Sequence, residues 1–233
     1  MTTPARAAAA AETTGLPPGD GERFAGFGVM GLPFASGHVL AMRRFPASSI
    51  GPAYTSVWHR DPDGRWTFWQ NQPDAQSCPR YFATAANETR RLDIELSWPT
   101  ESTLRIDVPD VGLEWTSLLT STPVTRVLNA VGRVLPDPAW RFRPLLAAMG
   151  PMAGRALGAG RVGMVGTTPN DQSFIANPLR MWVIDASSAR LGDDDFGPVG
   201  PLGEQARLGD FWIPQRGVFT IGRVSFAAGG GEG

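Results

Sequence analysis

The sequence of 233 residues contains no lysine, because all 21 of its basic residues are arginine. The absence of a side-chain amine excludes Schiff-base aldolases, enzymes that hold pyridoxal phosphate on a lysine, and nucleotide-binding P-loops. Cysteine and histidine are scarce as well, with Cys78, His38 and His59 as the whole supply. One thiol and two imidazoles exclude a cysteine-rich zinc site, an iron–sulfur cluster and an internal disulfide. The histidines also lack the short spacing of a metal-binding pair, so we expect neither a metal nor a cofactor.

The sequence also lacks a strong charge of either sign and any long apolar run. Its 21 basic and 22 acidic residues give a net charge of -1, without the clustered arginines of a nucleic-acid surface. No run reaches the roughly 18 apolar residues of a membrane span. The alanine run at residues 7–11 has too short an apolar core for a secretory signal. We therefore expect a soluble cytoplasmic protein with a reduced Cys78, no nucleic-acid partner and no integral membrane span.

Glycine and proline are abundant, with 28 and 21 residues respectively. They are concentrated between short alternating apolar runs, which is typical of a many-stranded antiparallel fold. The chain is long enough for a single core that needs no disulfides. We predict one β-rich domain over residues 23–226, a flexible N-terminal tail over residues 1–22 and a flexible C-terminal tail over residues 227–233.

The clearest local pattern is a β-hairpin within residues 53–72. Residues 61–64, Asp-Pro-Asp-Gly, separate two apolar runs and suit a type I turn followed by a left-handed glycine and a bulge. The expected register pairs Asp61 with Arg65, His59 with Thr67, Trp58 with Phe68 and Val57 with Trp69. Both faces of this hairpin then carry large apolar groups. We therefore expect a barrel interior on one side of the sheet and a helix or second layer on the other.

Further strands are predicted by the same alternation of apolar and polar residues. They cover residues 38–45, 92–98, 102–108, 113–118, 161–166, 173–176, 180–185, 209–213 and 218–226. Residues 121–158 differ, since Pro123 and Pro138 follow capping residues and apolar residues then recur at helical spacing. Gly150 and Pro151 should bend or break the second helix. This helical insertion either covers one face of the sheet or forms a mobile lid or a membrane-touching element.

Candidate proton-transfer groups are few. His59 lies on a predicted strand between Trp58 and Trp66, where an imidazole with an ordinary pKa of about 6.5 can move protons near neutral pH. The alternative is a structural histidine whose two nitrogens bond neighbouring groups. His38 opens a strand, which places it at a possible barrel rim.

Of the strand carboxylates Asp93, Glu95, Asp107 and Glu114, the better candidates for a cavity are Glu95, near Trp98, and Glu114, next to Trp115. Burial among indole rings raises the pKa of a carboxyl group and makes it a usable acid. On the other strand face either residue would be exposed and paired with arginine at little energetic consequence. The candidate catalytic residues are therefore His59, Glu114, Glu95 and His38.

Eight tryptophans are many for a chain of this length, and most of them fall in predicted strands. Aromatic residues on strands usually form core, but flat rings also line cavities for large hydrophobic ligands. The candidate ligand-binding residues are Tyr54, Trp58, Trp66, Trp69, Trp98, Trp115 and Trp182. The arginine pairs at 43–44 and 90–91 are predicted to face solvent, with ligand clamps as the alternative, and the acidic run at 193–195 is also predicted to face solvent.

Four segments carry a resemblance to a known family. Residues 37–45 read Gly-His-Val-Leu-Ala-Met-Arg-Arg-Phe, and residues 53–68 read Ala-Tyr-Thr-Ser-Val-Trp-His-Arg-Asp-Pro-Asp-Gly-Arg-Trp-Thr-Phe. Residues 169–174, Pro-Asn-Asp-Gln-Ser-Phe, and residues 182–187, Trp-Val-Ile-Asp-Ala-Ser, follow later. Together they resemble strands of the lipocalin-like family that contains carotenoid 1,2-hydratase and the AttH proteins. The resemblance implies an antiparallel lipocalin-like barrel or curved sandwich, apolar substrates such as isoprenoids or polyketides, and hydration or cyclisation without a cofactor.

Three functions fit these patterns. The first is a cofactor-independent hydratase, cyclase or isomerase that moves protons on a hydrophobic small molecule, such as a terpenoid or polyketide, in a tryptophan-lined cavity. The second is a non-catalytic carrier or sensor of an apolar ligand in the same cavity. The third is an interaction protein whose aromatic residues only form core.

Overall fold

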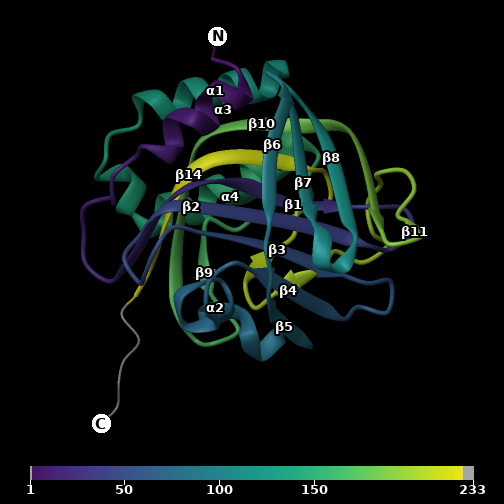
Figure 1. The fold of residues 1–233 in the computed structure, drawn as a ribbon. Helices are drawn as coiled ribbons and strands as arrows, with labels where there is room; N and C mark the ends of the chain where they lie inside the picture. Colours follow the sequence, from purple (N-terminus) through teal and green to yellow (C-terminus); the bar gives the residue numbers. More distant parts are fainter. Residues whose placement is uncertain (1, 228–233) are drawn as a thin grey trace.

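The computed structural model of the protein describes residues 2–227, and its main feature is one strongly curled sheet (Figure 1). Its strands are β1 (Glu22–Pro33), β2 (Val39–Ser48), β3 (Tyr54–Arg60), β4 (Trp66–Gln70), β5 (Glu88–Arg91), β6 (Glu95–Thr100), β7 (Thr103–Val108), β8 (Leu113–Thr120), β9 (Val165–Thr167), β10 (Ser173–Leu191), β11 (Asp194–Asp195) and β14 (Val218–Phe226). The order along the sheet is β5-β4-β3-β2-β1-β14-β10-β8-β7-β6, and β9 and β11 pair with β10. Neighbours are antiparallel except β4 and β5, which are parallel. The predicted fold class, a mainly β curled sheet with a helical insertion, is confirmed.

The predicted hairpin is confirmed in its register. The paired residues are His59 with Thr67, Trp58 with Phe68 and Val57 with Trp69. The Asp61 N–H donates to the Arg65 carbonyl over 3.0 Å, which closes the turn. Gly64 has a φ of 89°, the left-handed conformation that the turn requires of a glycine.

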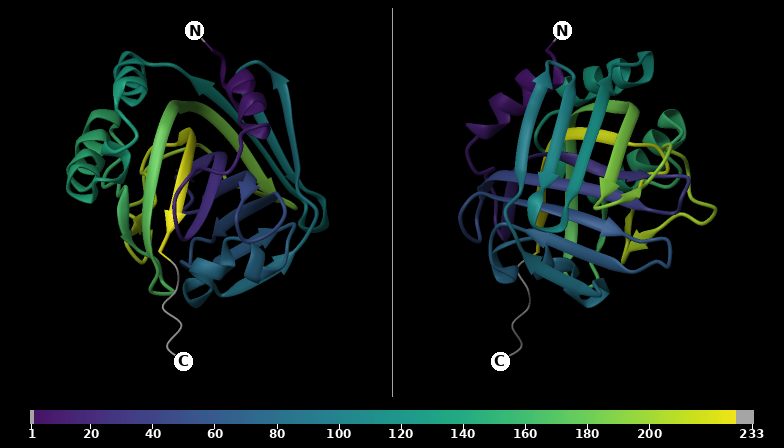
Figure 2. Two further views of the ribbon diagram at one scale, coloured as in Figure 1. Left: turned by 90° about the vertical axis from the view of Figure 1, so that its left-hand side faces the viewer. Right: turned by 45° about the vertical axis from the view of Figure 1, so that its right-hand side comes forward.

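The sheet separates two hydrophobic cores, as the two apolar faces of the hairpin predict. We call the side that lines the inside of the curl the inner face and the other side the outer face. The inner core joins Trp69 of β4 to Leu104 of β7, because the sheet curls until these distant strands face each other (Figure 2). The outer core contains Trp58 and Phe68 of the same hairpin.

Helices and short segments cover the outer face. They are α2 (Pro79–Phe82), α3 (Pro123–Val134), α4 (Arg143–Leu157), the two-stranded sheet of β12 (Arg207–Leu208) and β13 (Phe211–Trp212), and the 3₁₀ turns Asp74–Gln76, Ala83–Ala85 and Ala139–Arg141. A further 3₁₀ turn, Pro109–Val111, joins β7 to β8 and packs against the inner core through Val111. Both predicted helices of the insertion exist, and Figure 2 shows them outside the curl. Of the expected bend or break at Gly150 and Pro151, the break is wrong, since α4 runs through both residues. Pro151 is exposed, so its ring and the hydrogen bond that it cannot donate lie toward solvent.

The predicted flexible tail over residues 1–22 is wrong for α1 (Pro4–Glu12). The Thr3 side chain caps this helix by accepting the N–H of Arg6, and alanine is the best helix former. Ala7, Ala8 and Ala11 are buried in the inner core. The segment is therefore a packed part of the fold.

Strand β1 is absent from the predicted strands although it lies between β2 and β14. Gly26, Gly28 and Gly31 interrupt its apolar pattern, and glycine is depleted in strands. Gly26 is required because the backbone of β2 lies very close to it: a Cβ at this position would lie 2.0 Å from the Arg44 carbonyl oxygen. The strand depends on a contact with β2 that lies far along the sequence.

Two further predictions, of two separate strands within residues 173–185 and of a C-terminal tail, can be compared with the structure. Residues 173–176 and 180–185, predicted as separate strands, belong to the single long strand β10, whose pairing with β14 shifts register between Pro178 and Arg180. Residues 228–233, most of the predicted C-terminal tail, lie outside the described residues. No helix within residues 2–227 is long and apolar enough to cross a membrane.

Candidate functional site

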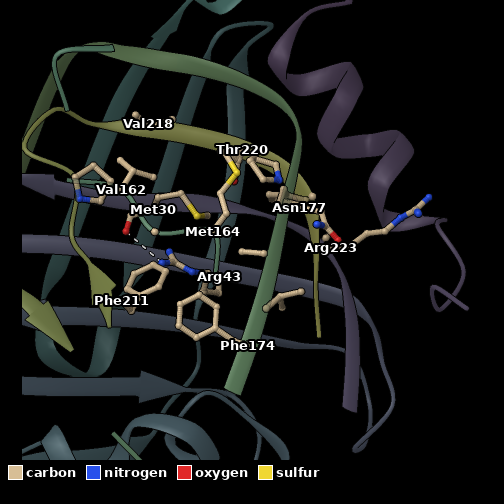
Figure 3. Close-up of a pocket in the computed structure, with 18 of the residues that line it drawn as sticks. Met30, Arg43, Val162, Met164, Phe174, Asn177, Phe211, Val218, Thr220 and Arg223 are labelled. Atoms are coloured by element: carbon tan, nitrogen blue, oxygen red, sulfur yellow. Dashed lines mark hydrogen bonds between the residues drawn. The ribbon is translucent and has the colours of Figure 1, made fainter. Parts of the chain in front are cut away.

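A cavity of about 140 Å³ lies on the outer face of the sheet, against the middle strands. Its walls come from β1, β2, β3, β10, β14 and α4, and from the segment around β13 (Figure 3). Most lining residues are apolar or aromatic, among them Met164, Phe174 and Phe211. No carboxylate or imidazole of residues 2–227 lines it. A largely apolar cavity with a few polar groups is the usual form of a small-molecule site.

Glycines on adjacent strands leave room for the cavity. Gly26 of β1 pairs with Gly222 of β14, and both line the cavity. Neither can carry a side chain, since a Cβ on Gly222 would lie 2.5 Å from the Asn177 carbonyl oxygen. The close contact between strands therefore removes side chains where a packed sheet would have them, and the helical cover spans the gap.

Arg43 of β2 is the cation of this cavity. Its side chain is buried and lies beside Phe174 and Phe211 (Figure 3). The guanidinium donates hydrogen bonds to the carbonyl oxygens of Val29, of Met42 over 2.9 Å and of Met30 over 3.2 Å. Burial lowers the pKa of Arg43 to about 10, so the group stays protonated at neutral pH.

Tyr54 and Cys78 are the polar groups beside Arg43. The Tyr54 hydroxyl and the Cys78 Sγ lie 3.7 Å apart, and both residues line the cavity. Burial raises the pKa of the Tyr54 hydroxyl and the pKa of the Cys78 thiol. Both are neutral at physiological pH, so Cys78 is a buried thiol rather than a reactive thiolate.

The prediction that Arg43 faces solvent is wrong. In β2 the residues alternate between faces, with Leu40 and Met42 in the inner core and Ala41 in the outer core. Arg43 therefore shares the outer face with Ala41 and Phe45. This alternation was a signal in the sequence that would have placed Arg43 on a buried face.

The predicted ligand-binding aromatics divide between the two faces. Tyr54 and Trp58 line the cavity. Trp69, Trp115 and Trp182 are buried in the inner core, Trp98 packs against that core, and Trp66 belongs to the outer core without lining the cavity. Sequence reasoning missed Arg43, Phe174 and Phe211 as lining residues, because the last two lie far along the chain from β2 and β3.

His38 and His59 form a pair on the inner face, away from the cavity. His38 Nδ1 lies 3.0 Å from His59 Nε2, and His38 Nε2 lies 3.2 Å from a carboxylate oxygen of the exposed Asp194. If His38 donates its Nε2 proton to Asp194, its Nδ1 accepts the proton of His59 Nε2. The ring of Phe196 stacks on His38 with centroids 3.9 Å apart.

Burial and the neighbouring His38 lower the pKa of His59 to about 4. His59 is therefore neutral at physiological pH. The sequence identified each histidine separately and did not bring them together, although His59 pairs with Leu40 across β2 and β3. The geometry of the structural alternative is that of His38, whose two ring nitrogens both lie beside partners, whereas the contact of His59 is made through Nε2.

Glu95 and Glu114 do not line the cavity, and the expectation that they are buried among tryptophan rings is wrong. Glu95 is exposed on the edge strand β6, and Glu114 is half-buried on β8, which lies between β10 and β7. Glu114 accepts a hydrogen bond from Arg190 at 2.5 Å and pairs with Arg105 at 3.5 Å. The hydrogen bond from Arg190 lowers the pKa of Glu114. Strand alternation turns Trp115 inward and Glu114 outward.

No group of three or more metal-ligating side chains occurs within the described residues. No protein-family model matches the chain, and no curated protein matches it. Among solved structures, the chain is similar to acetoacetate decarboxylase from Legionella pneumophila, with 13% sequence identity and a TM-score of 0.43 over 91% of this chain and 87% of that chain. A likeness this distant carries no argument about activity or substrate.

Proposed function

We propose that the protein binds a hydrophobic small molecule in the cavity on the outer face of the sheet. The observation that supports this most is an apolar cavity of about 140 Å³ beside a buried arginine. Protein interiors are close-packed, and an apolar space of this size is rare without a ligand to fill it. The inner face, in contrast, is filled by its own aromatic side chains. The best-supported function is that of a carrier or sensor.

The test is a titration of the protein with uncharged ring compounds, benzamide and benzyl alcohol, followed by calorimetry. Ala176 lines the cavity, so Ala176→Phe places a ring in it, whereas Ala10→Phe places the same ring on an exposed helix position. We expect saturable binding by the wild type and by Ala10→Phe, and none by Ala176→Phe. Binding that survives Ala176→Phe, or the absence of saturable binding of any ring compound of this size by the wild type, contradicts the proposal.

A second proposal is a cofactor-independent enzyme, a hydratase, cyclase or isomerase of terpenoid or polyketide type, as the resemblance implies. The observation that favours it is the meeting of Arg43, Tyr54 and Cys78 in one cavity. A buried guanidinium stabilises a developing oxyanion, and a neutral tyrosine hydroxyl donates a proton. Tyr54 would take the role predicted for His59, which lies on the other face.

Mass spectrometry distinguishes the two proposals. Material that co-purifies with the protein from its native host is extracted under denaturing conditions and identified. The identified compound is then incubated with fresh protein. Unchanged compound supports the carrier or sensor, whereas an isomer or a hydrated product that the Tyr54→Phe variant does not form supports the enzyme.

A further inference from the structure

Arg43 carries a charge that the described protein does not neutralise. None of the ion pairs among residues 2–227 includes it. The polar side chains beside it, Tyr54 and Cys78, are neutral at physiological pH. An isolated charge in an apolar interior is costly, and buried charges are normally paired. A bound anion would supply the missing partner.

The guanidinium keeps donors for such an anion. Arginine has five N–H donors. Two on Nη1 bond the carbonyl oxygens of Val29 and Met42, and one on Nη2 bonds that of Met30. One donor on Nε and one on Nη2 remain. Two donors on one planar guanidinium match the two oxygens of a carboxylate.

Aromatic rings hold the guanidinium and continue into the cavity. The Cζ of Arg43 lies 4.7 Å from the ring centroid of Trp58 and 5.3 Å from that of Phe211. Carbonyl oxygens and ring faces therefore fix the position of the cation before any ligand arrives. Such preorganisation lowers the entropic cost of binding.

The volume limits the size of the apolar part of the ligand. An apolar protein cavity of about 150 Å³ accepts benzene, and this cavity measures about 140 Å³. The second cation of the lining, Arg223, points away from Arg43 in Figure 3 and pairs with Asp137 at 3.6 Å. One ring-sized apolar body and one negative charge fit the site.

We propose that the ligand is a small monocarboxylate whose carboxylate pairs with Arg43 and whose ring-sized apolar body lies among Trp58, Phe174 and Phe211. This proposal rests on the proposed function of the cavity and adds the chemical class of its ligand. It also assigns Arg43 as the residue that determines specificity. A neutral ligand of the same shape would leave the charge of Arg43 unpaired and would bind more weakly.

The test compares benzoate, benzamide and phenyl phosphate in calorimetric titrations of the full chain at neutral pH. Benzoate and benzamide have nearly the same shape and differ in charge. We expect benzoate to bind about tenfold or more tightly than benzamide, as a charge-assisted bidentate pair predicts. Phenyl phosphate reports whether the site takes the larger, more highly charged phosphate, and tighter binding of phenyl phosphate than of benzoate contradicts a carboxylate site.

Two variants test whether the preference for benzoate over benzamide depends on Arg43. Arg43→Gln should bring benzoate down to the affinity of benzamide and leave benzamide unchanged. Arg44→Gln is the matched control, since Arg44 is the next residue of β2 and pairs with Glu12 at 2.9 Å instead of lining the cavity. It should keep the wild-type ratio. A benzoate preference that persists in folded Arg43→Gln overturns the proposal.

If Arg43→Gln does not fold, the titration of the wild type with benzoate and benzamide still tests the proposal. Equal affinity of the wild type for benzoate and benzamide overturns the carboxylate proposal and leaves the binding function intact. Absence of binding by every probe, benzyl alcohol included, overturns the binding function and this proposal with it.

Discussion

The two faces of the sheet use the same strands for different purposes. On β3, Val57 and His59 face the inner core, while Tyr54 and Trp58 face the outer core. The inner face buries Trp69, Trp115 and Trp182 with their neighbours in one continuous core. The outer face leaves a cavity, and its polar centre is a cation.

This contrast shows which sequence features indicate a site in this molecule. Most tryptophans belong to the hydrophobic cores, because large aromatic rings on strands bury much apolar surface. The candidate functional residue is Arg43, whose charged side chain is buried in an apolar cavity, where charges are rare. Arg43 is therefore more informative about function than any of the tryptophans.

The largest expected effect is on stability and distinguishes packed rings from lining rings. Trp115 is fully buried, and its Nε1 donates to the Ser187 hydroxyl over 3.0 Å. Trp115→Ala should lower the free energy of unfolding by about 3–5 kcal/mol. Phe211→Ala should cost less, because this half-buried ring already borders empty space. Urea denaturation measures both, and equal losses would contradict the difference between the faces.

The next effect is a pH dependence that belongs to the inner face. The pKa of His59 is about 4 in the folded protein and 6.5 in an ordinary environment. Between these values the unfolded chain binds a proton that the folded protein does not, so stability falls as the pH falls from about 6.5 to about 4. The loss amounts to about 3 kcal/mol and is complete below pH 4.

Removal of the imidazole tests this assignment. His59→Gln keeps a donor for His38, and it should remove most of the loss of stability between pH 6.5 and pH 4. Urea denaturation at several pH values measures the slope. The same slope in wild type and His59→Gln would show that other groups cause the acid sensitivity.

The smallest effect concerns Arg43 and stability. Arg43→Met removes a buried unpaired charge but leaves the carbonyl oxygens of Val29, Met42 and Met30 without their donor. These contributions oppose each other, so the free energy of unfolding should change by no more than about 1 kcal/mol. Urea denaturation of Arg43→Met beside Trp115→Ala gives the comparison. A loss as large as that of Trp115→Ala would make Arg43 a structural residue.

Local patterns predicted much of the fold. The turn residues at 61–64 determined the hairpin register, and the proline caps indicated the helices of the insertion. Strand β1 escaped prediction because glycines interrupt its pattern, and Gly26 and Gly28 are explained by close contact with the backbone of Arg44 and Met42 on β2. Helix α1 escaped because its alanines are stabilised by the inner core. Both depend on partners that are distant in the sequence.

The site was less predictable than the fold. Tyr54 and Trp58 were identified from their place on the hairpin, and both line the cavity. Phe174 and Phe211 come from β10 and β13, and only the folded sheet brings them to Arg43. Whether a strand residue such as Glu114 faces inward depends on a register that a short alternating run does not determine.

The central claim is that the ligand lies on the outer face, with its carboxylate on Arg43. A crystal of the protein soaked with 4-bromobenzoate tests it directly, because the anomalous scattering of bromine identifies the position of the ligand. The account predicts one bromine in the cavity between Phe174 and Phe211, with the carboxylate within hydrogen-bonding distance of the Arg43 guanidinium. Bromine inside the curl among Trp115 and Trp182, or beside the His38–His59 pair, would contradict it.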